Sequence, residues 1–392
     1  MSVVIINRWL DNFCDYSKII KNRNIIYITN KDGSQYVNQY DHNAKNIVLD
    51  DLNNYSSLKK AVENILIKDK IELIIAMSEN DIANAGHLRT DFGIKGMDYD
   101  TSKKFTNKTY MKKALKNTNI FYPKFGELKY IEHYNFNYPI VLKPKNGNSS
   151  KGVTIVKNSN ELLSFITHCK NIENYEFEEY ISGDIYHVDG YVSKGKLKFC
   201  KPSRYINTPL QYETNNSPLG SQLILDKNFD LKVFNFTKDV LKTLGLKNSV
   251  FHLEFIYHNG NLFFLEVGAR QGGGEIVPLY KQVFGIDLVK ILLKTQLLEN
   301  IDERPIRKEK SGGYLLFPVP NNAPCIVNKV TKINNIKTIK YQISPNIGEK
   351  LTKNGGYYFN SGRFLFIGDF ITIKKDIKRV IDEFKIYTEK IK

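Results

Sequence analysis

Short apolar, β-prone runs alternate with helix-length polar stretches at the start of this chain, and this alternation constrains the fold more than any other feature. The runs lie at 3–6, 25–28, 47–49 and 73–76. The alternation predicts a small parallel α/β domain. No Gly-x-Gly-x-x-Gly motif follows the first run, where the chain reads Asn7-Arg8-Trp9. We therefore do not expect a dinucleotide site.

The length of 392 residues, of which 42% are hydrophobic, predicts about two to three domains. We expect an N-terminal α/β domain at 1–100, a second domain at 101–305 with a lid subdomain at about 121–180, and a C-terminal α/β cap at 306–392. No stretch approaches the roughly 20 apolar residues that span a bilayer, and the start lacks the layout of a signal peptide. We expect a cytoplasmic protein that does not contact membranes. The four cysteines form no Cys-x-x-Cys pair, so we predict neither a disulfide framework nor a thiolate zinc site.

The formal net charge of +16 indicates a partner, since a field of that sign attracts phosphates, nucleic acid or an acidic protein. Lysine is spread along the whole chain beside abundant Asn and Ile, which favours an ordinary solvated surface over a dedicated patch. We therefore do not expect nucleic acid as the partner. An acidic carrier protein is a partner that the charge allows.

One lysine lies inside an apolar strand in the segment 139–156. Lys143 loses hydration there unless an anion compensates it, and a loop of small residues follows it that lets backbone N–H groups close over phosphates. The small residues of this loop are Gly147, Ser149, Ser150 and Gly152. The segment predicts a phosphate flap, and it is not a Walker A motif because it joins two strands. The alternative is an ordinary hairpin whose lysine extends into solvent.

Two carboxylates are embedded in the apolar strands of a predicted hairpin that turns at Asn259-Gly260. Glu254 and Glu266 are costly there unless a cation holds them, and hard oxygen ligands are what Mg²⁺ prefers. A strict two-residue turn would pair Glu254 with Leu265, so one extra loop residue or a bulge is required. With a three-residue loop, the two glutamates lie opposite each other and His252 joins them. The alternative is a pair of acids on the solvent face of an edge hairpin.

Two further segments, one directly after the hairpin and one at 177–189, supply other polar groups. Arg270 follows the second strand and is positioned to clamp an oxyanion, and Gly272 and Gly273 let a substrate approach the backbone, although glycine runs are also common in turns. The extended segment 177–189 has the composition to read adenine through a backbone N–H and C=O, with side-chain acids on the exocyclic amine and the ribose.

The order and spacing of these parts resemble the ATP-grasp superfamily, particularly its carboxylate-amine ligases such as L-amino-acid ligases, with biotin carboxylase more distant. The resemblance covers nearly the whole chain and includes the segment Asn107-Lys108-Thr-Tyr-Met111-Lys112, the strand lysine with its loop, and the two-glutamate hairpin. It implies an α/β (α+β) ATP-grasp fold with an N-terminal Rossmann-like domain, a flap and lid subdomain, and a C-terminal cap.

The resemblance also implies roles for individual residues. The residues expected to bind ATP are Lys108, Lys143, Gly147, Ser149, Ser150, Gly152, Glu178, Glu179, Ile181, Asp184 and Lys201. The first two would contact the nucleotide phosphates, and Glu178, Glu179 and Ile181 would line the adenine. Glu254 and Glu266 would hold Mg²⁺, or Mn²⁺ in its place. Lys143 and Arg270 are the expected catalytic residues, with Arg270 steadying an acyl phosphate.

Three positions depart from the family pattern. Gly268 stands where an Asn usually follows the second metal glutamate, Asn107 stands where an Asp usually precedes the first lysine, and Ile185 replaces an acid. The first departure removes a ligand of a second metal position, and we expect Asp184 to make the ribose contact in place of Ile185. The residues expected to contact substrate are Arg204, His252, Gly272 and Gly273.

The resemblance implies a ligase that uses ATP and Mg²⁺ to activate a carboxylate as an acyl phosphate and joins it to an amine, releasing ADP and phosphate. The expected substrates are amino acids or a peptide, and a homodimer is an assembly that the resemblance allows. One alternative is carboxylation through carboxyphosphate, which would require bicarbonate. The other is a basic nucleic-acid-binding protein without enzymatic activity, which would bind random DNA in a salt-sensitive way.

Overall fold

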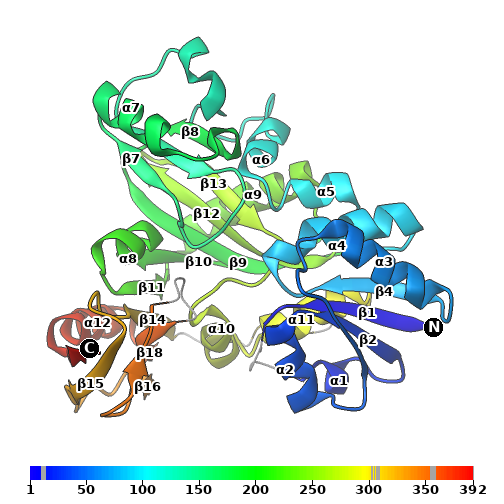
Figure 1. Cartoon of the computed structure of the whole chain (residues 1–392). Helices are drawn as coiled ribbons and strands as arrows, with labels where there is room; N and C mark the ends of the chain where they lie inside the picture. Colours follow the sequence, from blue (N-terminus) through cyan, green and yellow to red (C-terminus); the bar gives the residue numbers. More distant parts are fainter. Residues whose placement is uncertain (10–14, 302, 304, 306–309, 354–358, 392) are drawn as a thin grey trace.

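The computed structural model describes residues 1–9, 15–301, 303, 305, 310–353 and 359–391. Four sheets with their helices make up this part of the chain (Figure 1). None of its helices combines the length and the apolar run that a bilayer crossing needs. Cys169, Cys200 and Cys325 are free thiols, whereas Cys14 and residue 306, the expected start of the C-terminal cap, lie outside the described residues.

The N-terminal sheet is parallel and has the strand order β3-β2-β1-β4. Its strands are β1 (Ser2–Asn7), β2 (Asn24–Thr29), β3 (Lys45–Val48) and β4 (Ile71–Ala76). Its helices are α1 (Tyr16–Ile19), α2 (Lys31–Tyr40), α3 (Tyr55–Leu66) and α4 (Glu79–Phe92). β1 is buried along its whole length, as expected for a parallel strand covered by helices on both faces. The predicted alternation of strands and helices is confirmed.

In the sequence, Thr101-Ser102 offers an N-cap for one helix that would carry Phe105, Lys108, Met111, Lys112 and Leu115. This prediction of a single helix is wrong. The structure has two helices, α5 (Tyr99–Lys103) and α6 (Lys108–Ala114). Each has its own N-cap, because the side chain of Asp98 accepts a hydrogen bond from the backbone N–H of Thr101 and that of Asn107 accepts one from Tyr110. Asn107 therefore performs the capping that an Asp would perform.

The lid sheet is antiparallel, lies at the top of Figure 1 and has the order β5-β8-β6-β7. Its strands are β5 (Phe125–Glu127), β6 (Ile140–Pro144), β7 (Thr154–Val156) and β8 (Tyr175–Glu179). Its helices are the 3-10 turns η1 (Leu128–His133) and η2 (Ile172–Asn174) and the α-helix α7 (Ser159–His168). Leu142 of β6 and Phe177 of β8 face the lid core. Because side chains alternate along a strand, Lys143, Glu176 and Glu178 face the other side.

The central sheet has eight strands in the order β13-β12-β9-β10-β11-β14-β18-β16. Five of them precede residue 300: β9 (Asp184–Ser193), β10 (Lys196–Ile206), β11 (Leu219–Leu223), β12 (Ser249–His258) and β13 (Asn261–Gly268). Its helices are α8 (Pro209–Asn215), α9 (Lys227–Leu244), α10 (Ile276–Phe284) and α11 (Leu288–Gln296). The glycine that follows the helical pattern near 231–244 predicts a helix end at Gly245, and the left-handed φ of +85° there confirms it.

The C-terminal strands divide between two sheets. Three of them, β14 (Ser311–Pro318), β16 (Ile339–Ile343) and β18 (Asn360–Gly368), extend the central sheet from β11. The others, β15 (Cys325–Val330), β17 (Lys350–Leu351) and β19 (Ile386–Lys390), form a small separate sheet. The stripe of apolar residues at 377, 380, 381 and 384 predicts an amphipathic helix, and the structure has this helix as α12 (Phe370–Glu383), with Ile377 and Val380 buried. The C-terminal region is thus partly continuous with the central sheet.

Candidate active site

A cavity of about 290 Å³ lies between the lid sheet and the central sheet. Nine residues predicted for the site line it: Lys108, Lys143, Gly147, Ser150, Glu178, Glu179, Ile181, Glu254 and Glu266. They come from α6, β6, the flap loop at 147–152, β8 and the segment directly after it, β12 and β13. The fold therefore brings the predicted lysines and glutamates together.

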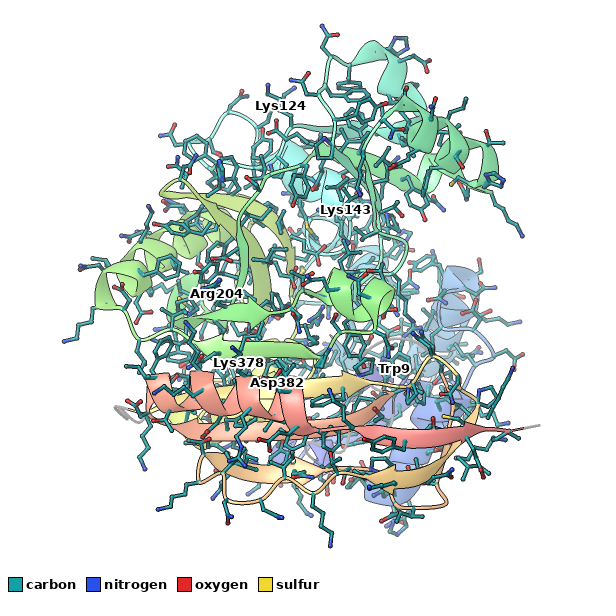
Figure 2. The ribbon with its side chains drawn as sticks, turned by 90° about the vertical axis from the view of Figure 1, so that its left-hand side faces the viewer. Trp9, Lys124, Lys143, Arg204, Lys378 and Asp382 are labelled. Atoms are coloured by element: carbon teal, nitrogen blue, oxygen red, sulfur yellow. The ribbon has the colours of Figure 1, made fainter. Side chains whose placement is uncertain are left out.

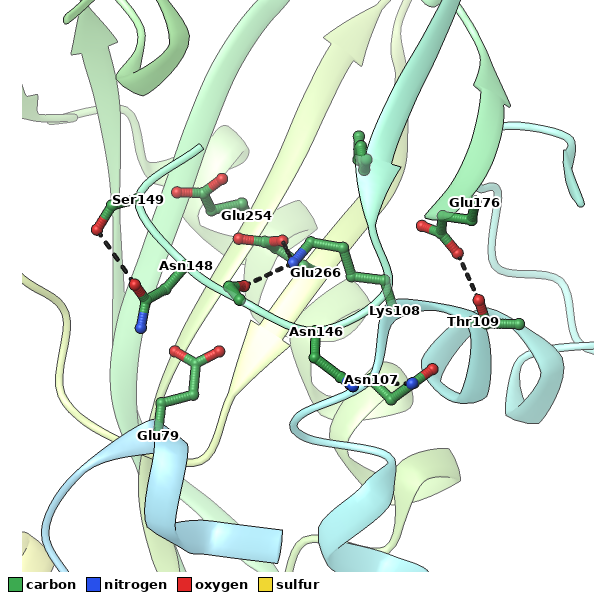
Figure 3. Close-up of polar contacts among 12 residues, drawn as sticks. Glu79, Asn107, Lys108, Thr109, Asn146, Asn148, Ser149, Glu176, Glu254 and Glu266 are labelled. Atoms are coloured by element: carbon green, nitrogen blue, oxygen red, sulfur yellow. Dashed lines mark hydrogen bonds and ion pairs between the residues drawn. The ribbon is translucent and has the colours of Figure 1, made fainter. Parts of the chain in front are cut away.

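The two lysines enter the cavity from different elements. Lys108 lies in the first turn of α6, and its Nζ donates to the backbone oxygen of Gly147 at 2.8 Å and pairs with Oε2 of Glu266 at 2.9 Å (Figure 3). Lys143 lies on β6, and its Nζ is 2.5 Å from Oε2 of Glu178. Both lysines thus have a carboxylate partner, which offsets part of the cost of their burial.

A third buried lysine, which the sequence did not assign to the site, lies one helical turn beyond Lys108. Lys112 is fully buried and pairs with both Glu176 and Glu178. Burial raises the pKa of Glu176. Burial also opposes ionisation of Glu178, but Lys112 and Lys143 outweigh it and hold the pKa of that carboxyl below its ordinary value. The spacing of four residues between Lys108 and Lys112 was the available signal, since it places both on one helix face.

The glutamate hairpin has the predicted pairing, with Glu254 opposite Glu266. The three-residue loop is wrong, because His258 pairs directly with Asn261 around a two-residue turn. The left-handed φ angles at Asn259 and Gly260, +46° and +80°, fit such a turn. The required shift comes instead from a register change between Glu254 and Phe255, which is the bulge that the sequence allowed.

A buried polar network next to the cavity holds the carboxylate of Glu254 in place. Its Oε1 accepts from the hydroxyl of Tyr205 at 2.7 Å and lies 3.4 Å from Nε2 of His252. Burial opposes ionisation of Glu254, but these contacts prevail and lower its pKa. Burial likewise opposes the charged form of His252, but Asp189, 2.8 Å from Nδ1, raises the pKa of that imidazole to about 9. His252 does not line the cavity and instead orients Glu254.

The network continues from Asp189 to His187, whose Nδ1 lies 2.6 Å from Oδ2 of the aspartate and whose Nε2 lies 2.6 Å from Oγ of Ser221. His187, Asp189 and His252 present nitrogen and oxygen atoms within 4.8 Å of one another. Both histidines are already hydrogen-bonded to Asp189 inside the fold, so we interpret the three residues as a structural network. Asp189 was missed, because a single acid in an apolar strand gives no sequence signal for its partners.

Arg270 joins the central sheet to the N-terminal sheet. Its Nε and NH2 lie 2.7 Å and 2.6 Å from Oε2 of Glu79, at the start of α4, and its NH1 donates to the backbone oxygen of Gln271. Gly268, which replaces the usual Asn, lies against this pair, because a Cβ there would be 3.4 Å from the arginine and from Glu79. Glu79 is the contribution of the N-terminal sheet that sequence reasoning did not find.

The two glycines after Arg270 differ in their surroundings. A Cβ on Gly272 would lie 2.6 Å from Oδ1 of Asp189 and 2.8 Å from Nδ1 of His252. The glycine is therefore needed for close packing on the buried network. Gly273 is exposed. Neither lines the cavity.

Three predicted site residues lie on the α9 side of the central sheet or at its edge. Arg204 pairs with Asp184 at 2.7 Å, and both are about half exposed. Arg204 lies opposite Tyr186 on β9, whose ring packs on Phe229 of α9. Figure 2 shows Arg204 well apart from Lys143.

Lys201 pairs with Asp230 of α9 and does not line the cavity. Strand alternation, which directs neighbouring residues to opposite faces, explains why Arg204 and Asp184 miss the cavity that Ile185 lines.

Ser149 and Gly152 belong to the flap loop but do not line the cavity. Ser149 has a left-handed φ of +58° and its hydroxyl lies 3.5 Å from Oδ1 of Asn148 (Figure 3). A Cβ on Gly152 would meet the ring of Pro144 and the hydroxyl of Tyr175. Their contribution is to the shape of the loop.

Comparison with known proteins finds a matching domain and several similar ligases. Residues 136–278 match the ATP-grasp domain. The L-arginine-specific L-amino acid ligase of Bacillus subtilis is 26% identical over 307 residues, which cover 74% of this chain and 73% of that protein. The D-alanine–D-alanine ligase of Petrotoga mobilis is 25% identical over 41% of this chain and 58% of its own length, and the alanine–anticapsin ligase of Bacillus subtilis is 24% identical over 57% and 53%. The last two alignments thus cover little more than half of those proteins.

Two solved structures share the fold. An L-amino acid ligase from Bacillus licheniformis superposes with a TM-score of 0.75 and 16% identity, covering 99% of both chains. A biotin carboxylase from Campylobacter jejuni superposes with a TM-score of 0.67 and 14% identity, covering 99% of this chain and 92% of that one. Residues 136–278 thus match an ATP-grasp domain, and the whole chain has the fold of these solved structures.

Proposed function

We propose that this protein is an ATP-dependent carboxylate-amine ligase that forms an amide or peptide bond through an acyl phosphate and releases ADP and phosphate. The observation that carries the proposal is the convergence of Lys108, Lys143, Glu254 and Glu266 on one cavity between two sheets. Two cations and two carboxylates in one cleft fit a metal-bound polyphosphate. The similarity to amino acid ligases supports the same chemistry.

Glu254 and Glu266 are the residues that would hold Mg²⁺. Paired across the hairpin, both face the cavity, and they supply the carboxylate oxygens that Mg²⁺ or Mn²⁺ prefers. In this structure the ammonium group of Lys108 contacts Oε2 of Glu266, so this carboxylate oxygen already stabilises a cation. When bound, the metal would neutralise charge on the β- and γ-phosphates of ATP.

The nucleotide would lie between the lid and central sheets. Lys108 and Lys143 provide the positive charge for its phosphates, and the Gly147–Gly152 loop covers them. The cavity wall includes the apolar residues Val141 of β6, Ile155 of β7 and Leu265 of β13, which suits a flat adenine ring. The carboxylate of Glu179 already accepts a hydrogen bond from the backbone N–H of Lys124 at 3.0 Å. Its side chain would therefore position the segment before β5 more than it would contact the base.

The proposed reaction has two steps. A carboxylate oxygen of the first substrate attacks the γ-phosphorus, forming an O–P bond as the bond to ADP breaks, while the lysines stabilise charge on the transferring oxygens. An amine then attacks the activated carbonyl, which forms the C–N bond and a tetrahedral oxyanion. The amine loses a proton, and phosphate leaves as the C–O bond to it breaks and the carbonyl re-forms. Arg270 would stabilise the oxyanion of the second step, and closure of the flap loop would exclude water from the acyl phosphate.

A phosphate-release assay over pairs of amino acids tests this proposal. Release is expected only when ATP, Mg²⁺ and a suitable pair are present, and the product mass should equal the two substrates less one water. Lys143→Ala should lower turnover by roughly 10²-fold or more, because it removes a phosphate contact. Lys145→Ala is the matched control, since this neighbour pairs with Glu127 at 2.7 Å and does not line the cavity.

Bicarbonate dependence distinguishes the alternative reaction, carboxylation through carboxyphosphate, which the fold shared with biotin carboxylase supports. Phosphate release that requires bicarbonate, with no condensed product from any amine, would replace the ligase proposal with that reaction. Normal turnover by Lys143→Ala would remove that lysine from the mechanism.

A further inference from the structure

A second cavity, of about 170 Å³, lies between the N-terminal sheet and the central sheet. It shares no lining residue with the candidate active site. One side is formed by β4, α4 and the segment 95–98, and the other by the residues around Ser249, Ala269 and Gln296. Gln296 fixes this boundary, because its side-chain amide exchanges hydrogen bonds with the backbone of Ala76 at 3.2 Å and 3.1 Å.

Arg89 of α4 lines this cavity with a buried charge. It is 6% exposed. Its Nε and NH2 donate to the backbone oxygen of Ile74 at 3.0 Å and 2.6 Å, and its NH1 donates to that of Met97 at 3.1 Å. Both partners are neutral, as is the third, the amide oxygen of Gln296, which lies 3.4 Å from NH2.

The absence of a counter-charge sets Arg89 apart from Arg8, which is also buried. Arg8 pairs with Asp81 at 2.5 Å. Among the described residues, none of the carboxylates forms an ion pair with Arg89, and burial alone lowers the pKa of its guanidinium to about 10. A buried cation without an anion is costly, so an anion in the adjacent cavity would be stabilised.

Further cations lie at the exposed edge of the cavity. Lys95 and Lys247 line it and are both exposed, which indicates where an anion would enter. Asp98 is the lining residue of opposite charge, and its Oδ1 already accepts the backbone N–H of Thr101 at 2.7 Å. The remaining wall is apolar and includes Ile74, Ala76, Ile82 and Met97.

We propose that this cavity is a binding site for a small carboxylate with a short apolar chain. The guanidinium of Arg89 and the two lysines would hold the carboxylate, since an NH1 hydrogen of Arg89 is left unbonded after its four contacts. The apolar wall would hold the chain. The occupant would touch both sheets and lie beside Ala269, the residue before Arg270.

Methionine methyl NMR tests this site without using catalysis. Protein labelled with ¹³C at its methionine methyl groups would be titrated with sodium butyrate at constant ionic strength. The methyl of Met97 should shift and reach saturation, because it lines the cavity. Met111 lies between Lys108 and Lys112 on α6 and reports on the candidate active site, so its resonance should stay unchanged. Butyramide, which has the same shape without the charge, should produce no saturable shift.

Two variants extend the test to the proposed contacts. Lys95→Ala/Lys247→Ala changes two exposed side chains, so it should fold normally and bind butyrate about tenfold more weakly. Arg89→Lys keeps the charge but loses the fork of donors, and it should weaken binding by at least as much. An equal response to butyramide, a stronger response to inorganic phosphate than to butyrate, or unchanged affinity in both variants would overturn the proposal. Such a failure would leave the proposed ligase activity untouched, because the test involves no turnover.

Discussion

At the scale of single residues, the site depends on buried charges that satisfy each other. Lys143, Glu178 and Lys112 form a continuous chain in which one carboxylate serves two lysines. Removing one member of such a group leaves an uncompensated buried charge, which costs more than the group contributes as a whole. The chain therefore fixes the position of Lys143 relative to the cavity.

The pH dependence of stability should reveal this group. The pKa of Glu178 is lower in the folded protein than its ordinary value of 4.5. Its charge therefore stabilises the fold above about pH 4.5, and the contribution is lost as the pH falls below that value. We expect Glu178→Gln to be less stable than wild type at pH 6, with a difference that shrinks as the pH is lowered to 3. Urea unfolding monitored by circular dichroism measures this, and a difference independent of pH would contradict the assignment.

At the scale of elements, the flap loop and the glutamate hairpin show different degrees of predictability. The strand lysine and the small residues after it predicted a loop between two paired strands, and the structure has this loop between β6 and β7. For the hairpin, the apolar neighbours of Glu254 and Glu266 predicted their pairing correctly, but the sequence offered two ways to achieve it. The structure has the bulge and not the longer loop, because Asn259-Gly260 is well suited to a two-residue turn. The one-residue change in register therefore lies inside the strand, between Glu254 and Phe255.

The conformation of the flap loop leads to a second prediction. Gly147 has a φ of +121°, and its backbone oxygen accepts from Lys108. An alanine there meets no neighbouring atom but is strained by about 1–3 kcal/mol, so the loop should leave this conformation. We expect Gly147→Ala to raise the KM for ATP by about tenfold.

Gly195→Ala provides a matched control, because Gly195 has a φ of +70°, also meets no neighbouring atom and lies in the turn between β9 and β10. It should lower stability by a similar amount without changing the KM for ATP. Equal KM values for the two variants would show that the flap loop does not contact the nucleotide.

At the scale of the whole molecule, contacts between sheets complete the site. The Glu79–Arg270 pair links the N-terminal sheet to the end of β13. β14, β18 and β16 enlarge the central sheet, and Arg363 of β18 reaches back to Glu275, in the same segment as Arg270. The segment after β13 is thus held from two sides.

Arg270→Ala tests the role of this linkage in catalysis. We expect the variant to bind ADP as wild type does in a thermal-shift assay, because Lys108 and Lys143 are intact. Ligation should fall by roughly 10²-fold, since a donor to the oxyanion is lost. Arg379→Ala removes an exposed pair on α12 and should change neither property measurably. Unchanged ligation by Arg270→Ala would contradict its assignment as a catalytic residue.

Local patterns in the sequence determined much of the secondary structure and several of the candidate site residues. The alternation of the first strands, the end of α9 at Gly245, the strand lysine and the paired glutamates could all be recognised, because each depends on neighbouring residues or on the cost of burying a charge. Local patterns failed at 99–115, where two caps of similar strength divide one expected helix into α5 and α6.

Only the tertiary structure decided which polar residues meet. Arg204 and Asp184 have suitable chemistry but face away from the cavity, because the face of a strand residue relative to the site depends on the sheet as a whole. Lys201 pairs with Asp230 of α9 instead. Lys112, Asp189 and Glu79 became site components through partners more than 60 residues away in the sequence. Pairing over such separations is set by packing between elements, and no local pattern in the chain encodes it.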